Sequence, residues 1–177
     1  RFGTDGSHNV GLGVDGFFRL SDADYILLNL IQGFRTALTN RPLLDQSVMS
    51  VDWQRRTSQG FGGNLTALYV GDLYDPGLGF NQRNGGTELS GTALYGWFDD
   101  ESPLIRKHTV SASWSTFLRN DNGMNESSSF GGGWKTEFKS GASVTIGGST
   151  MYEALRDPLT FSENVLVPPG QYPFHNI

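Results

Sequence analysis

The chain has 177 residues, no cysteine and a net charge of −5. Without cysteine there is no disulfide scaffold, thiolate metal site or cysteine nucleophile, and an acidic chain without a basic stripe argues against a nucleic-acid partner. No run of about 18 apolar residues occurs, which excludes a bundle of transmembrane helices. A membrane β-barrel is compatible with the 37% hydrophobic content, because the inner side of such a barrel is polar.

Apolar and polar residues alternate in segments of strand length. The pattern is clearest in His8–Leu20, where Val10, Leu12 and Val14 share one face and polar residues or glycine lie between them. Only an extended strand sorts successive side chains onto opposite faces. The same reasoning predicts strands over Tyr25–Leu38, Gln46–Arg56, Phe61–Gly71, Phe80–Phe98, Arg106–Leu118, Asn125–Phe138 and Ala142–Tyr152, with a ninth strand beginning at Gln171. No helix of useful length is predicted.

The connections between these strands alternate in length, except that the fifth and sixth depart slightly from the pattern. Asp75-Pro76-Gly77 has the chemistry of a turn, and Asn120-Asp121-Asn122-Gly123 is a strong hairpin signal. Short connections are predicted at Ser21–Asp24, Thr57–Gly60 and Lys139–Gly141, and longer ones at Thr39–Asp45, Asp72–Gly79 and Ala154–Gly170. Short turns on one side and longer loops on the other are typical of outer-membrane barrels. On this pattern both ends of the chain lie on the external side.

Strand length favours a membrane environment. A strand of about 13 residues is about 43 Å long and, tilted by about 40°, spans about 33 Å, which is enough for a hydrocarbon core. Six aromatic residues near strand ends would suit the two membrane interfaces: Tyr25, Trp53, Tyr69, Tyr95, Trp97 and Tyr152. Trp114 and Trp134 are more central. The prediction is an all-β, antiparallel, up-and-down transmembrane β-barrel of about eight strands plus the start of a ninth. A soluble sandwich or lipocalin-like barrel would show a similar alternation.

Several segments resemble a known family. They are Val51–Gly86, Tyr95–Ser111, Phe138–Leu155 and the stretch GLGVDGFFRLSDADYIL, with Asp75–Phe80 the sharpest piece. The sequence resembles an uncharacterised family of bacterial outer-membrane β-barrels in which the barrel follows a carbohydrate-binding-like domain of the family-nine type. The resemblance implies that residues 1–177 are a single segment of a larger barrel in the bacterial outer membrane. It carries no activity or site residues.

No catalytic, cofactor-binding or metal-binding residue is predicted. Asp99, Asp100 and Glu101 could bind Ca²⁺, but a solvated acidic loop is the simpler interpretation. The segment 120–123 with Glu126 lacks calcium-loop spacing, and a hairpin turn explains it better. The three histidines, His8, His108 and His175, are isolated from one another. Charged side chains could line a lumen as a mixed-charge surface; the basic ones are Arg19, Arg35, Arg55, Arg56, Lys135 and Lys139 and the acidic ones are Asp15, Asp52, Glu88 and Glu137.

The predicted function is that of an outer-membrane scaffold, channel or uptake component linked to carbohydrate binding, without enzymatic activity. The expected partners are outer-membrane lipid and also glycans or other surface proteins, with no nucleic acid and no cofactor. Two alternatives stay open: a non-catalytic structural subunit of a surface assembly, and a soluble all-β binding module. A glycan hydrolase is a weaker alternative, because it would need paired carboxylates about 5–10 Å apart in one cavity.

Overall fold

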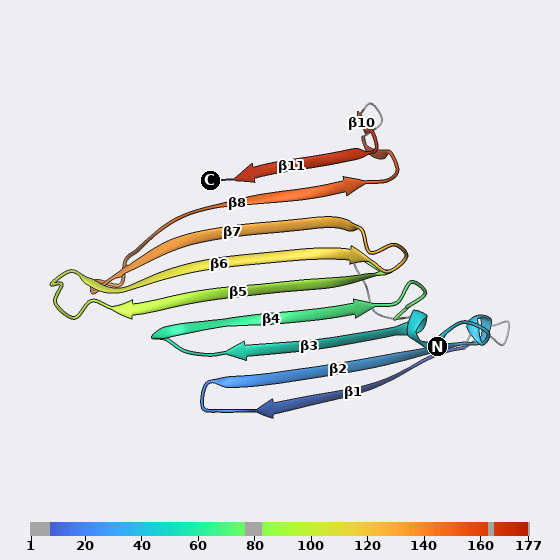
Figure 1. The fold of residues 1–177 in the computed structure, drawn as a ribbon, viewed down its shortest axis with the longest axis horizontal. Coiled ribbons are helices and arrows are strands. Elements are labelled where there is room, and N and C mark those ends of the chain that lie inside the picture. The colour runs from blue at the N-terminus through green and yellow to red at the C-terminus, as the bar shows by residue number, and fades with distance from the viewer. Residues whose placement is uncertain (1–7, 77–82, 163–164, 177) are drawn as a thin grey trace.

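The structure is a computed structural model that describes residues 8–76, 83–162 and 165–176. These residues form a nine-stranded antiparallel sheet in the order β1-β2-β3-β4-β5-β6-β7-β8-β11, and a separate two-stranded sheet of β9 and β10 (Figure 1). The strands are β1 (Asn9–Arg19), β2 (Asp24–Arg35), β3 (Ser47–Arg55), β4 (Gly60–Val70), β5 (Gly86–Phe98), β6 (Ile105–Arg119), β7 (Asn125–Phe138), β8 (Ser143–Leu155), β9 (Leu159–Ser162), β10 (Val165–Val167) and β11 (Gly170–Asn176). Two 3₁₀ turns, η1 (Thr36–Leu38) and η2 (Leu43–Gln46), follow β2.

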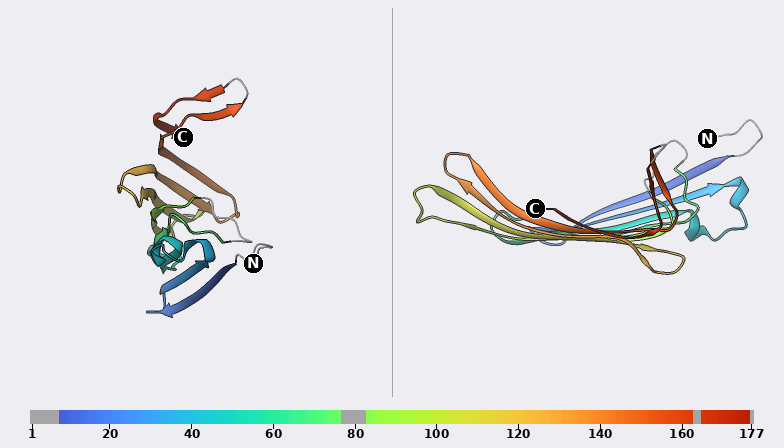
Figure 2. Two further views of the ribbon diagram at one scale, coloured as in Figure 1. Left: turned by 90° about the vertical axis from the view of Figure 1, so that its right-hand side faces the viewer. Right: turned by 90° about the horizontal axis from the view of Figure 1, so that it is seen from above.

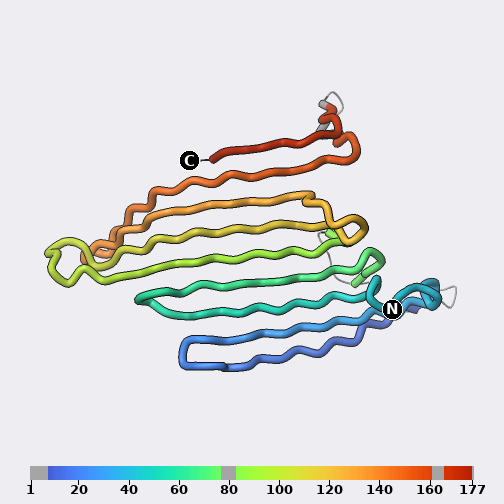
Figure 3. Tube along the Cα trace, viewed as in Figure 1, coloured from blue at the N-terminus to red at the C-terminus, as the bar shows by residue number. Residues whose placement is uncertain are grey.

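The chain meanders from one strand to its neighbour across the sheet (Figure 3). Connections 20–23, 56–59, 99–104 and 139–142 lie at one end of the strands, which we call the short-loop end. Connections 36–46, 71–85, 120–124 and 156–169 lie at the other, the long-loop end. In the described part of the chain, no helix is both long and apolar enough to cross a membrane.

The register separates the sheet into two chemically distinct faces. Directly paired residues of an antiparallel sheet point to the same side, and the pairs Val14–Leu30, Leu30–Met49 and Met49–Tyr69 are typical of one side. We call this side the apolar face; its large side chains are Val10, Leu12, Val14, Phe18, Ile26, Leu28, Leu30, Phe34, Met49, Val51, Trp53, Phe61, Leu65, Tyr69, Leu89, Tyr95, Trp97, Val110, Trp114, Leu118, Phe130, Trp134, Val144, Ile146 and Tyr152.

The opposite side, the polar face, is rich in hydroxyl, amide and charged side chains. It carries Asn9, Asp15, Arg19, Asn29, Arg35, Ser50, Asp52, Asn64, Thr66, Glu88, Ser90, Thr92, Lys107, Thr109, Ser111, Ser113, Ser115, Ser127, Ser129, Lys135, Glu137, Thr145, Ser149 and Glu153. Apolar side chains also lie on this face, both near one edge of the sheet and in its middle; among them are Phe17, Ile31, Leu68, Val70, Leu94 and Phe117.

The sheet is a single curved layer rather than two packed layers (Figure 2). Among the described residues only two hydrophobic side chains are buried, Val70 and Phe117 at 4% and 8% exposure. On the apolar face, by contrast, Val14 and Ile146 are 73% and 74% exposed. Soluble monomers rarely expose apolar patches larger than a few hundred Å². This sheet therefore leaves uncovered the kind of surface that other proteins bury.

The predicted all-β antiparallel fold is confirmed, and the nine strands of the main sheet agree with eight strands plus a ninth. The sheet is open, however: β1 and β11 each have one neighbour, so the structure does not establish a barrel. The predicted loop Ala154–Gly170 contains the hairpin of β9 and β10, which was not predicted. β11 begins at the long-loop end, in agreement with a ninth strand starting at Gln171, and Asn176 lies beside Ser149 in the middle of β8. That both chain ends lie on the external side stays a prediction.

Candidate functional site

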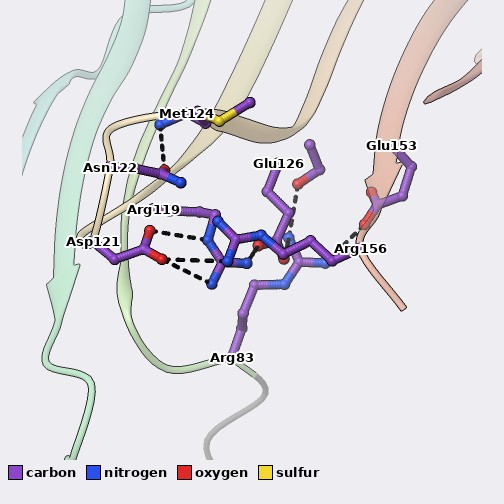
Figure 4. A network of polar contacts seen from close by, with 9 residues as sticks. Arg83, Arg119, Asp121, Asn122, Met124, Glu126, Glu153 and Arg156 are labelled. Carbon is purple, nitrogen blue, oxygen red and sulfur yellow. Dashed lines mark hydrogen bonds and ion pairs between the residues drawn. The ribbon is translucent and has the colours of Figure 1, made fainter. Parts of the chain in front are cut away.

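A network of charged side chains lies on the polar face at the long-loop end (Figure 4). Its centre is Arg83, which precedes β5 and extends across β6 and β7. One guanidinium nitrogen, Nη1, donates to Ser127 Oγ at 2.8 Å and lies 3.6 Å from Glu126 Oε1. The other, Nη2, donates to Glu153 Oε1 of β8 at 3.2 Å. Arg83 thus connects the segment before β5 to two strands that are not its neighbours.

Phe117 forms the base beneath this arginine. The guanidinium carbon of Arg83 lies 4.7 Å from the centre of the Phe117 ring, a cation–π arrangement. On its other side the ring occupies the space above Gly86, where any Cβ would collide with it. A glycine is therefore required at the start of β5, and the neighbouring aromatic covers the gap that it leaves.

The hairpin between β6 and β7 contributes a second group of ion pairs. Arg119 donates to Asp121 Oδ1 at 3.1 Å and to Glu126 Oε2 at 2.7 Å, and Arg156 donates to Asp121 Oδ2 at 3.3 Å. The predicted hairpin turn is confirmed here: Gly123 has φ +67°, which glycine adopts without strain. The turn geometry thus brings Arg119, Asp121 and Glu126 together.

Two cavities flank the network. The larger, about 620 Å³, is lined by Leu68, Val70, Arg83, Glu88, Ser115, Thr116, Phe117 and Ser127. The smaller, about 380 Å³, is lined by Asp72, Asn84, Gly85, Arg119, Asp121 and Glu126. The Arg83–Glu126 ion pair joins a wall of one cavity to a wall of the other. Both cavities open on the polar side of the sheet and offer hydroxyl and charged groups to a hydrophilic ligand.

We predict that the attachment of the 120–124 turn weakens in acid. The hydrogen bond from Arg119 lowers the pKa of Asp121 below its ordinary 3.8, and the bond from Arg156 lowers it further. A carboxyl group with a lowered folded-state pKa stabilises the fold above its unfolded pKa and loses that contribution as the pH falls through the folded value. Unfolding measured between about pH 5 and pH 2 should therefore show a smaller stability loss in Asp121→Asn than in the unmodified protein. Equal losses in the two proteins would contradict this assignment.

An aromatic cluster lies on the apolar face towards the short-loop end. The Trp97 ring centre is 5.2 Å from that of His108 and 5.9 Å from that of Trp134. Trp134 Nε1 donates to His108 Nδ1 at 3.2 Å, and Thr136 Oγ1 lies 3.0 Å from the same nitrogen. Trp134, expected to be central, therefore joins the aromatic residues near this end.

The other interface candidates divide between the two faces. Trp53, Tyr69, Tyr95 and Tyr152 lie on the apolar face. Tyr25 lies on the polar face, where it stacks on Phe17 with ring centres 5.5 Å apart. It is therefore not part of the aromatic row on the apolar face.

The weak metal candidates do not come together. Asp99 Oδ1 accepts from the Ser102 backbone N–H at 3.1 Å, which is loop geometry. His8 hydrogen-bonds Thr36, and His175 lies on β11, far along the sheet order from His8. Among the described residues, no three His, Cys, Asp or Glu side chains are grouped to hold a metal ion.

Most of the segment Asp75–Phe80 lies outside the described residues. Asp75 itself forms an ion pair with Arg35 at 3.5 Å.

Most of the network was not predicted from the sequence. Glu126 was considered in another context, but Arg83, Arg119, Glu153 and Arg156 were not. One signal was available, since the alternation of β8 continues past Tyr152 and places Glu153 on the polar face. The partners of Arg83 lie 44 and 70 residues away in the sequence, and only the strand register brings them together.

Comparisons with protein-family models, curated proteins and solved structures found no match.

Proposed function

We propose that this chain is a segment of a bacterial outer-membrane β-barrel that acts as a scaffold, channel or uptake component. The observation that carries the proposal is the exposed apolar face, which extends over eight neighbouring strands while the other face is polar. Lipid chains cover such a face in membrane barrels, whose strands alternate between lipid-facing apolar and lumen-facing polar residues.

The height of the apolar face fits this environment. On β6 the distance along the strand from His108 to Leu118 is about 33 Å. With a tilt of about 40° it corresponds to about 25 Å along the membrane normal, the usual height of the apolar band. The cluster of Trp97, His108 and Trp134 would lie at one interface, and Tyr69 and Tyr152, near the long-loop end, at the other.

The direction of the edge strands supports a larger barrel. Each of the nine strands is antiparallel to its neighbour, so β1 and β11 run in the same direction. Antiparallel closure would therefore require an odd number of further strands between them. If a second copy of this chain were inserted in the same orientation, its β1 would lie beside β11 of the first copy, and these two strands would be parallel. We therefore propose that the further strands have a different sequence.

The alternatives have less support. A soluble binding module needs a cover for the apolar face, and the described residues supply no second layer. A structural subunit of a surface assembly would still need lipid or a partner on that face. A glycan hydrolase would need a pair of catalytic carboxylates. Glu126 and Glu153 lie on either side of Arg83, but both form ion pairs with it. The proposed link to carbohydrate binding rests on the family resemblance alone.

The test uses two neighbouring positions on β8 in a chain without cysteine. Thr145 points to the polar face and Ile146 to the apolar face, and both are exposed. In the full protein reconstituted into lipid vesicles, Thr145→Cys should react with a membrane-impermeant maleimide, and Ile146→Cys should react only after unfolding. Equal labelling of the two folded variants, or failure of the protein to float with the vesicles, would reject the membrane assignment.

A further inference from the structure

We propose that Arg83 sets the charge selectivity of the larger polar-face cavity: its guanidinium supplies the positive charge that keeps the cavity from favouring cationic solutes. The inference rests on the proposed function, in which the polar face borders an aqueous lumen. Among the described lining residues, Arg83 is the single cation and Glu88 the single anion. The remaining polar groups are the hydroxyls of Ser115, Thr116 and Ser127. On the described lining, the positive charge of Arg83 stands against the negative charge of Glu88.

Arg83 also neutralises carboxylates beyond the cavity wall. It lies 3.6 Å from Glu126 and 3.2 Å from Glu153, and these two side chains come from different strands. Glu126 has a second partner in Arg119, at 2.7 Å. Removing the guanidinium would therefore take away the Arg83 ion pair of Glu153 and leave Glu88 as the charged side chain on the described cavity lining.

The guanidinium of Arg83 has a fixed place on the cavity wall. It is held above the Phe117 ring by the cation–π contact and by the hydrogen bond to Ser127. Phe117 and Ser127 line the same cavity as Arg83. Both the size and the charge of Arg83 therefore act on a solute in this cavity.

A cysteine at position 115 can report on this cavity. The reporter Ser115→Cys is treated with two thiosulfonate reagents of similar size, one cationic and one anionic, in the vesicle-bound full protein. In Arg83→Gln, which keeps most of the side-chain volume, the ratio of cationic to anionic reaction rates should rise roughly tenfold, as expected for losing one nearby unit charge. Arg83→Ala should give the same shift and also faster reaction with a bulky maleimide.

Three controls make the result decisive. Arg83→Lys keeps the charge and should keep the ratio within about twofold of the unmodified reporter, because the Coulomb term is retained. Arg19→Ala removes an arginine at the short-loop end, paired with Asp22 at 2.8 Å, and should not change the ratio. An unchanged ratio in Arg83→Gln would overturn the inference, and so would an equal rise in Arg19→Ala. If Thr145→Cys does not react in vesicles, the proposed function itself fails. The Thr145→Cys measurement does not involve Arg83, so it distinguishes that failure from a failure of the inference about Arg83.

Discussion

Replacing Phe117 by alanine is expected to lower the free energy of unfolding by about 3 kcal/mol, at the lower end of the range for buried phenylalanine. Phe117 is one of the two buried hydrophobic side chains among the described residues. Its ring fills the space above Gly86 and supports the Arg83 guanidinium. The alanine variant would lose both contacts and open a gap between β5 and β6. Denaturant unfolding of the protein in detergent or vesicles measures the change.

A matched substitution separates this packing from general effects of removing an aromatic ring. Phe130 lies on the neighbouring strand β7 but on the apolar face, where it is 58% exposed. Phe130→Ala in detergent should cost clearly less than Phe117→Ala, because less of its surface is packed against protein. Similar losses in the two variants would show that Phe117 is not an anchor of the polar face.

An arginine at position 112 is expected to destabilise the membrane-inserted protein by about 2–4 kcal/mol, the cost of that side chain at the middle of a bilayer. Ala112 lies near the centre of β6 on the apolar face, between Ala93 and Gly132. Its two direct cross-strand partners, Ala93 and Gly132, carry no polar side-chain group. Urea unfolding in vesicles of defined lipid gives the difference in free energy.

The neighbouring residue supplies the control. Ser113 is also small, but it points to the polar face and is exposed. Ser113→Arg should change stability by no more than about 0.5 kcal/mol, as expected for a surface substitution. If both variants lose the same free energy, or if Ala112→Arg is tolerated, lipid does not cover the apolar face.

The strands could be predicted because alternation is a local property. The limits of β7 agree with the prediction Asn125–Phe138. The prediction failed where apolar residues remain in phase beyond the true end of a strand. The second strand was extended to Leu38, whereas β2 ends at Arg35 and η1 follows. For the fifth strand, predicted over Phe80–Phe98, β5 begins at Gly86, after Gly85 turns the backbone with φ +71°. The predicted start at Phe80 lies outside the described residues.

The site could not be predicted in the same way, because it depends on register. Nothing in the sequence near Arg83 indicates Ser127 or Glu153 as partners, and each contact needs the correct pairing of β5, β6, β7 and β8. The hairpin of β9 and β10 was missed for another reason. Prolines at 158, 168 and 169 favour a loop, yet the prolines lie outside the two short strands.

The two-residue period of the strands also limits how the length of this chain can change. One residue inserted within β6 would move every side chain beyond it to the opposite face. Tryptophan and valine would then point to the polar side, and serine to the apolar side. Insertions in connections such as 156–169 leave the pairing of β8 with β7 unchanged. Epitopes or reporter domains should therefore be accepted at the long-loop end and rejected within the strands.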